Sequence, residues 1–221
     1  MKDLLPPHTR ALAKRALRPG PKPGEIRLDS NEQACLPSPK VLDAIRMATM
    51  MVNRYPETGS LDLRASIANY TGVATDQMVV GNGSDEIIEW LARALLGHGD
   101  QVIVPKPSFF YYATTTRAVG GDVVYVDRNP DFSLNVNAIL AAATPRAKIL
   151  YIANPNNPTG ESVPRDTIVT LLDRLDCLVV VDECYFEFHG ETVIDLLPRY
   201  EHLFVMRSFS KAFGLAGLRV G

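Results

Sequence analysis

Short runs of apolar residues, separated by stretches with a helical periodicity, predict an alternation of strands and helices. The runs are MVV at 78–80, VIV at 102–104, VVYV at 123–126, ILYIA at 149–153, LVVVD at 178–182 and LFVM at 203–206. They are continuously apolar rather than alternately apolar and polar. This pattern is typical of strands buried on both faces of a mainly parallel sheet.

The clearest helix is predicted over residues 84–97. Ile87, Ile88, Leu91 and Leu95 form an apolar stripe at helical spacing, and Gly97 is expected to close the helix. Strands and helices together predict an α/β fold of three layers, α/β/α, with helices on both faces of the sheet. Such sheets bind ligands outside the carboxyl ends of their strands, so the polar residues at those ends are the candidates for function.

Composition narrows the class of protein. The formal net charge is −2 over 221 residues, which argues against a nucleic-acid or anionic-membrane partner. No apolar run approaches the ~20 residues of a membrane span, and the N-terminal residues lack the apolar core of a signal peptide. Three cysteines without a C-x-x-C pair make a disulfide framework or a zinc site unexpected. We therefore expect a cytoplasmic protein without a metal, in which proline-rich residues 1–30 form an arm that packs on another part of the molecule.

The segment GNGSDE at 81–86 stands between a predicted strand and a predicted helix. Its two glycines permit a tight turn, and the free N–H groups of a helix N-terminus favour an anion. One alternative is a dinucleotide fingerprint, G-x-G-x-x-G, but Glu86 occupies its third glycine position. A second alternative is a capped helix with Ser84 or Asp85 as the N-cap. No G-x-x-x-x-G-K-[ST] motif occurs in the chain, which excludes a P-loop.

Two further segments follow predicted strands directly. In ANPNNPTG at 153–160 the prolines either make a rigid turn or hold an asparagine amide at the ligand-binding edge. In VVVDECYFEF at 179–188, Asp182 ends a buried strand, where a carboxylate is costly without a positive partner or several donors. Asp182 is therefore expected to meet a protonated ring nitrogen or to form a structural ion pair. Tyr185 is either part of a site or packed in the core.

The segment RSFSKAFGLAGLRVG at 207–221 combines two serines, a lysine and an arginine. Ser208, Ser210 and Arg219 are suitable ligands for a phosphate, since a guanidinium offers a planar fork of donors. Lys211 stands among apolar residues that could lower the pKa of its amine, as a lysine that forms a Schiff base requires. A solvated lysine is the alternative.

Taken together, these elements resemble the fold-type I, class I/II aminotransferases that use pyridoxal phosphate. The resemblance is carried by NPTG at 157–160, D-x-x-Y at 182–185, S-x-S-K at 208–211 and Arg219. Within the family, RLDSNEQACLPSPKVLDAI and the following RYPETGSLDLRASIANYTGV are most similar to histidinol-phosphate aminotransferases. That subfamily usually shows an N-E-N-P-x-G-like string where this chain has NEQACL at 31–36. The departure concerns the substrate rather than the cofactor.

The resemblance implies a role for each matching residue. Lys211 would hold pyridoxal phosphate as a Schiff base and then act as the general base, and Asp182 would keep the ring nitrogen protonated. Asn157 and Tyr185 would bind the phenolic oxygen, and Phe109 would stack on the ring. The phosphate would be bound by the following residues: Gly83, Ser84, Asp85, Ser208, Ser210 and Arg219. Tyr55 would reach the phosphate of a neighbouring subunit, which implies a homodimer.

The resemblance also implies a division of the chain and a reaction. Residues 31–221 would form an incomplete cofactor-binding large domain, with the C-terminal small domain and its substrate-binding arginine absent. The expected reaction is transamination between 2-oxoglutarate and histidinol phosphate, in histidine biosynthesis, or an aromatic amino acid. Decarboxylation of a phosphorylated amino acid and a non-catalytic cofactor-binding fragment are the alternatives. A nicotinamide dehydrogenase is disfavoured by Glu86.

Overall fold

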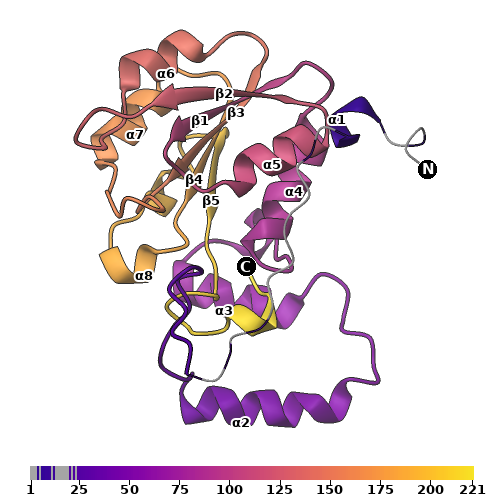
Figure 1. Cartoon of the computed structure of the whole chain (residues 1–221). Helices are drawn as coiled ribbons and strands as arrows, with labels where there is room; N and C mark the ends of the chain where they lie inside the picture. Colours follow the sequence, from indigo (N-terminus) through magenta and orange to yellow (C-terminus); the bar gives the residue numbers. More distant parts are fainter. Residues whose placement is uncertain (1–3, 5, 11, 13–19, 21, 23) are drawn as a thin grey trace.

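The computed structural model describes residues 4, 6–10, 12, 20, 22 and 24–221 (Figure 1). Within these residues the sheet has five strands, all parallel, in the order β2-β1-β3-β4-β5. The strands are β1 Gln101–Lys106, β2 Asp122–Asp127, β3 Ala147–Ala153, β4 Leu178–Asp182 and β5 Leu203–Met206. The predicted α/β fold with a mainly parallel sheet is confirmed.

Helices pack on both faces of this sheet, as the continuous apolar runs predicted. Figure 1 shows α6 (Val136–Ala142) and α7 (Arg165–Leu172) on one side, and α4 (Ser84–Leu95) and α5 (Tyr111–Ala118) on the other. The core is accordingly divided into two clusters. Val179 and Val181 of β4 pack with the α6–α7 cluster, whereas Val180 packs with the α4–α5 cluster. Side chains alternate along a strand, so the next residue on the α4–α5 side is Asp182.

The prediction of a strand over 78–80 is wrong. Met78 has extended backbone angles, but these residues belong to no strand among those described. The only ladder-like contact of the segment is at Gly81, which exchanges two backbone hydrogen bonds with Gly221, at 2.8 and 3.3 Å. An extended segment needs a partner along its length to become a strand, and Val79 remains exposed.

Helix α4 begins at Ser84, as predicted, and ends at Leu95, with Leu96 rather than Gly97 at the C-cap. Ile87 and Ile88 are buried, but Leu95 is 41% exposed. Towards its end the helix faces the core with Ala92 and Leu96 instead of Leu95. The N-cap is Gly83, at φ 82°, so the alternative of Ser84 or Asp85 as N-cap is also wrong.

The residues before α4 form helices that bury little. They comprise α2 (Pro39–Ala48), the 3₁₀ turn η2 (Thr49–Met51), α3 (Leu61–Thr71) and the 3₁₀ turn η3 (Thr75–Gln77), and none of them has a buried residue. The short helix α1 (Pro7–Arg10) lies beside α5, with the His8 ring 3.3 Å from the position that a Cβ on Gly120 would take. Of the proline-rich segment PGPKPG at 19–24, residues 19, 21 and 23 lie outside the described residues.

The remaining elements follow β4 and β5. They are α8 (Phe186–His189), η4 (Ile194–Leu196) and η5 (Ala216–Leu218). Among the described residues, no helix combines the length and the apolarity that crossing a membrane requires.

Candidate active site

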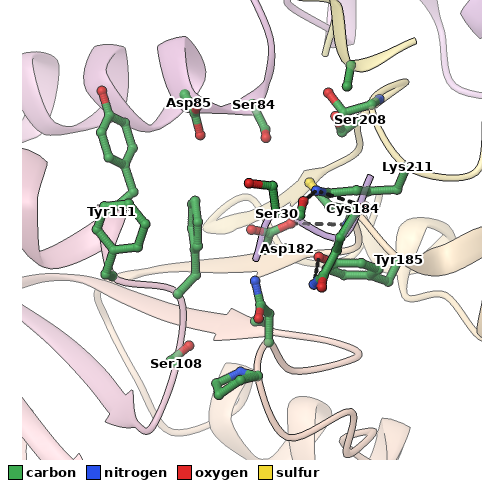
Figure 2. Close-up of a pocket in the computed structure, with 18 of the residues that line it drawn as sticks. Ser30, Ser84, Asp85, Ser108, Tyr111, Asp182, Cys184, Tyr185, Ser208 and Lys211 are labelled. Atoms are coloured by element: carbon green, nitrogen blue, oxygen red, sulfur yellow. Dashed lines mark hydrogen bonds between the residues drawn. The ribbon is translucent and has the colours of Figure 1, made fainter. Parts of the chain in front are cut away.

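A cavity of about 900 Å³ lies at the carboxyl ends of the parallel strands, where ligands of such sheets bind. Figure 2 shows Ser84, Ser208, Lys211 and Asp182 around this one space, although they come from α4, the β5 end and β4. Ten of the predicted site residues line it: Ser84, Asp85, Phe109, Asn157, Asp182, Tyr185, Ser208, Ser210, Lys211 and Arg219.

Two predicted residues do not line the cavity. Gly83 lies behind Ser84, and a Cβ built on it would stand 2.7 Å from Nη2 of Arg219. Tyr55 is 100% exposed and lies outside the cavity. The family resemblance implies that Tyr55 reaches the phosphate of a neighbouring subunit, and that role stays a prediction.

Asp182 is buried at the end of β4, with 7% of its surface exposed. The Tyr112 hydroxyl donates to its Oδ2 at 2.5 Å, and the Cys184 N–H donates to its Oδ1 at 3.1 Å. Burial raises the pKa of this carboxyl, and the hydrogen bonds from Cys184 and Tyr112 oppose that rise. No cation pairs with Asp182 within the described part of the chain. The alternative of a structural ion pair at Asp182 is therefore wrong.

The structural ion pair belongs to the next residue. Glu183 is fully buried and accepts hydrogen bonds from Arg207, whose Nη2 lies 2.8 Å from Oε2. Glu183 also accepts from the Thr192 hydroxyl and from the Val193 N–H. The Arg207 guanidinium lies 3.5 Å from the centre of the Phe186 ring. This arrangement ties the end of β4 to the end of β5.

Lys211 is half-buried, which excludes the alternative of a fully solvated amine. Its Nζ donates to the main-chain oxygen of Ser30 at 2.7 Å and, at 3.4 Å, to that of Asn31. Burial lowers the pKa of the Lys211 amine, because the protonated form loses water on entering the cavity wall. A larger neutral fraction makes the amine a better nucleophile and a better base.

Tyr185 and Asn157 line the cavity together with Lys211. The Tyr185 hydroxyl accepts a hydrogen bond from Nδ2 of Asn31 at 2.8 Å, and the Lys211 Nζ lies 5.9 Å from the Tyr185 ring centre. The alternative of Tyr185 as a core residue does not hold, because its ring lines the cavity. Phe109 also lines the cavity and packs edge-on against Tyr112.

Donors for an anion gather at the start of α4. The positive φ of Gly83 and the absence of a Cβ let the Arg219 guanidinium approach the backbone. Arg219 pairs with Asp85 at 3.2 Å and donates to the Ala216 carbonyl at 3.3 Å. The helix N-terminus and this guanidinium together favour negative charge at this end of the cavity.

Among the cavity residues that sequence reasoning missed are Ser30, Asn31, Tyr112 and Cys184. A signal for Cys184 was present, since it lies between Asp182 and Tyr185. No local signal marked Tyr112, because its relation to Asp182 spans 70 positions. The described residues hold no group of three or more His, Cys, Asp or Glu side chains arranged for a metal ion.

Comparison with known proteins places this geometry in a family. Residues 23–221 match the family described as "Aminotransferase class I and II". The chain is 43% identical over 199 residues to a histidinol-phosphate aminotransferase of Methanothermobacter thermautotrophicus, covering 89% of this chain and 53% of the relative. It is 40% identical over 197 residues to that of Methanococcoides burtonii, covering 89% and 55%. The chain thus spans about half the length of the curated relatives it matches.

Solved structures agree with the sequence relatives. The histidinol-phosphate aminotransferase of Sinorhizobium meliloti, in complex with pyridoxal-5′-phosphate, superposes with a TM-score of 0.81 at 29% identity, covering 86% of this chain and 53% of that one. The aspartate aminotransferase of Thermus thermophilus with maleate gives 0.80 at 29% identity, covering 87% and 54%. The match of the family over nearly the whole sequence is the decisive finding. The chain belongs to the class I and II aminotransferase family.

Proposed function

We propose that this chain forms the pyridoxal-phosphate-binding part of an aminotransferase that acts on histidinol phosphate with 2-oxoglutarate. The observation that supports the cofactor is the charge pattern of the cavity. A buried carboxylate without a cation, Asp182, and a half-buried lysine, Lys211, face the same space as an anion site at the start of α4. The substrate rests on the names of the relatives, which are histidinol-phosphate aminotransferases.

The residues fit this cofactor. Asp182 lacks the positive partner that a protonated ring nitrogen would supply, and Lys211 is the amine that would hold the aldehyde carbon. The phosphate would take the donors around Gly83, with Ser84, Ser208, Ser210 and Arg219. Asn157 and Tyr185 would bind the phenolic oxygen, and Phe109 would cover the ring. When bound, pyridoxal phosphate accepts the electrons left on the substrate Cα after its proton is removed.

The chain's own groups would move that proton. Lys211, freed from the carbonyls of Ser30 and Asn31, would take the proton from the substrate Cα with its neutral amine and deliver it to the cofactor carbon. Asp182 would hold a proton on the ring nitrogen, which maintains the electron demand of the ring. Residues 29–32 line the cavity and would limit access of water.

The assembly that we propose is a homodimer in which Tyr55 binds the phosphate of the other subunit. Full exposure of Tyr55, and the absence of buried residues in the neighbouring helix α2, support this arrangement. Residues 1–30 would remain an arm, and 31–221 the incomplete large domain. Light scattering would test the assembly, and a Tyr55→Phe variant with weaker cofactor binding would test the role of the hydroxyl.

Borohydride reduction tests the central assignment. Reduction of the cofactor-loaded protein, followed by peptide mass spectrometry, should find the adduct on Lys211. A Lys211→Ala variant should yield none, and a Lys148→Ala variant, changed at a partly exposed lysine, should behave as the parent. An adduct on Lys106 or Lys148, or no adduct in a loaded sample, would contradict the proposal.

Glutamate formation from 2-oxoglutarate, measured against release of CO2, separates transamination from decarboxylation.

A further inference from the structure

The hydroxyl of Tyr112 is the side-chain oxygen that holds Asp182. Tyr112 is fully buried in α5, and its O–H donates to Oδ2 of Asp182 at 2.5 Å. The Cys184 main-chain N–H occupies Oδ1. The Cys184 thiol also hydrogen-bonds this carboxylate, whose two oxygens together keep further lone pairs for a ligand in the cavity.

The fold fixes this contact firmly. Alternation along β4 turns Asp182 toward the α4–α5 face, and α5 brings Tyr112 to the same place. The Tyr112 ring stacks on Tyr151 of β3, with centroids 4.3 Å apart and an interplanar angle of 5°. Both rings are buried, so packing directs the hydroxyl of Tyr112 at Asp182.

The second tyrosine of this stack provides a natural comparison. The Tyr151 hydroxyl is buried and has no hydrogen-bond partner among the described residues. Burial, and the nearby charge of Asp182, raise the pKa of Tyr151 to a value above its ordinary range. Two phenols thus lie side by side in one apolar layer, and only one of them bonds the carboxylate.

The hydrogen bond from Tyr112 lowers the basicity of Asp182, because the groups around this carboxylate carry no positive charge. The titratable groups that interact with it are two tyrosines of the core, one cavity tyrosine, a thiol and a carboxylate, and none of them is a cation. They are Tyr112 from α5, Tyr151 from β3, Cys184 and Tyr185 after β4, and Asp85 from α4. A carboxylate in such a place is a strong base and competes for the proton of any ligand N–H⁺ that it meets. A donated hydrogen bond spreads the negative charge and weakens that basicity.

We propose that Tyr112 is a positioning residue that orients Asp182 and keeps the shared proton on the ring nitrogen of the bound cofactor. This inference rests on the proposed function. Without the hydroxyl, the proton would move from the ring nitrogen to an oxygen of Asp182. The pyridinium would become a neutral pyridine and the carboxylate a carboxylic acid, so the pair keeps its single proton and its net charge of zero.

Nitrogen NMR of the loaded protein tests the inference. The probe is pyridoxal phosphate labelled with ¹⁵N in the ring, bound to the parent protein, to Tyr112→Phe and to Tyr151→Phe. The parent and Tyr151→Phe should give the signal of a protonated ring nitrogen. Tyr112→Phe should shift the signal toward that of unprotonated pyridine. The two variants lose the same atom from the same ring stack, so a packing effect would move both.

The outcomes separate the inference from the function on which it rests. A parent protein that takes up no pyridoxal phosphate overturns both. A loaded protein in which Tyr112→Phe keeps the parent signal, or in which both variants shift equally, overturns the inference alone. If circular dichroism shows that Tyr112→Phe does not fold, 4-aminophenylalanine at 112 retains the ring with a weaker donor. It should produce a smaller shift in the same direction, and an unshifted signal there overturns the inference.

Discussion

The ends of β4 and β5 present two sides that are built from neighbouring residues and differ in how their charges are balanced. On the side away from the cavity, Glu183 and Arg207 satisfy one another, and Thr192 completes the hydrogen bonds. On the cavity side, and among the residues that the structure describes, Asp182 is bonded by neutral donors and Lys211 donates to main-chain oxygens. The Glu183–Arg207 pair thus stabilises the fold. Asp182 and Lys211 do not pair with one another and remain available to a ligand.

This difference shows that residues adjacent in sequence can serve stability and binding separately. Removing one partner of a buried ion pair strongly destabilises the fold, because the other charge is left buried without a partner. A buried carboxylate without a cationic partner, by contrast, destabilises the folded chain. A ligand with a positive group would offset that cost when it binds. Substitutions on the two sides should therefore have opposite effects on stability and on activity.

The largest expected effect is on stability and concerns the Glu183–Arg207 ion pair. Glu183→Gln should lower the free energy of unfolding by about 3–5 kcal/mol, because it leaves the Arg207 charge without its partner. Urea unfolding followed by circular dichroism measures the change. Asp195→Asn is the matched control, since Asp195 also forms two hydrogen bonds with an arginine, Arg165, but at the surface. The control should cost less than about 1 kcal/mol. Equal losses in the two variants would contradict the distinction.

The next effect is on the cavity side and concerns turnover. In a complete enzyme, Asp182→Asn should lower kcat on the order of 10²–10³-fold, about 2.7–4 kcal/mol of barrier, because a neutral amide cannot hold the ring nitrogen protonated. Cofactor occupancy, read from visible absorption, should fall far less. Unchanged turnover would remove Asp182 from the chemistry, and equal losses of turnover and occupancy would make it a structural residue.

The same substitution should reveal a dependence of stability on pH. Burial raises the pKa of Asp182 in the folded chain, so its contribution to stability is fully present below the unfolded pKa, ~3.9. That contribution is lost as the pH rises through the folded pKa. The cofactor-free Asp182→Asn variant lacks this loss, so its stability relative to the parent should increase from pH 4 to pH 7, by roughly 1–3 kcal/mol. Urea titrations at several pH values test the sign, and a constant difference would contradict it.

The smallest effect is expected at the edge of the cavity. Asp85 pairs with Arg219 at 3.2 Å, but both side chains are more than two-fifths exposed. Asp85→Asn should therefore change the free energy of unfolding by less than about 1 kcal/mol. It should tighten phosphate binding, since it removes a negative charge beside the guanidinium. Isothermal titration with inorganic phosphate measures that affinity, and weaker binding would show that Asp85 is needed to hold Arg219 in place.

Comparison of particular elements shows how far the sequence could predict the fold. Five of the six apolar runs are strands, because a continuous apolar run has few other ways to bury its side chains on both faces. The run at 78–80 failed because a strand also needs a neighbour, and that neighbour is decided by chain segments far apart. The stripe of α4 was right at Ile87 and Ile88 and failed at Leu95, because Ala92 and Leu96 take the core-facing positions at that end of the helix.

The residues of the candidate site also fall into those that the sequence could predict and those that it could not. The motif residues were predictable because their types and spacing are read along the chain, and ten of them line one cavity. Tyr112 and Asn31 could not be predicted, because Tyr112 meets Asp182 across 70 positions and Asn31 meets Tyr185 across 154. Nothing in the local pattern distinguishes them from other aromatic or amide residues.

The sequence by itself determined the alternation of strands and helices, the polar residues at the strand ends and the resemblance to class I and II aminotransferases. These features depend on periodicity and on motif spacing, which are properties of neighbouring residues. Tertiary structure alone decided which carboxylate received the arginine and which faced the cavity. Packing turned Glu183 toward Arg207 and Asp182 toward Tyr112, because the side chains of consecutive residues leave the strand end in opposite directions.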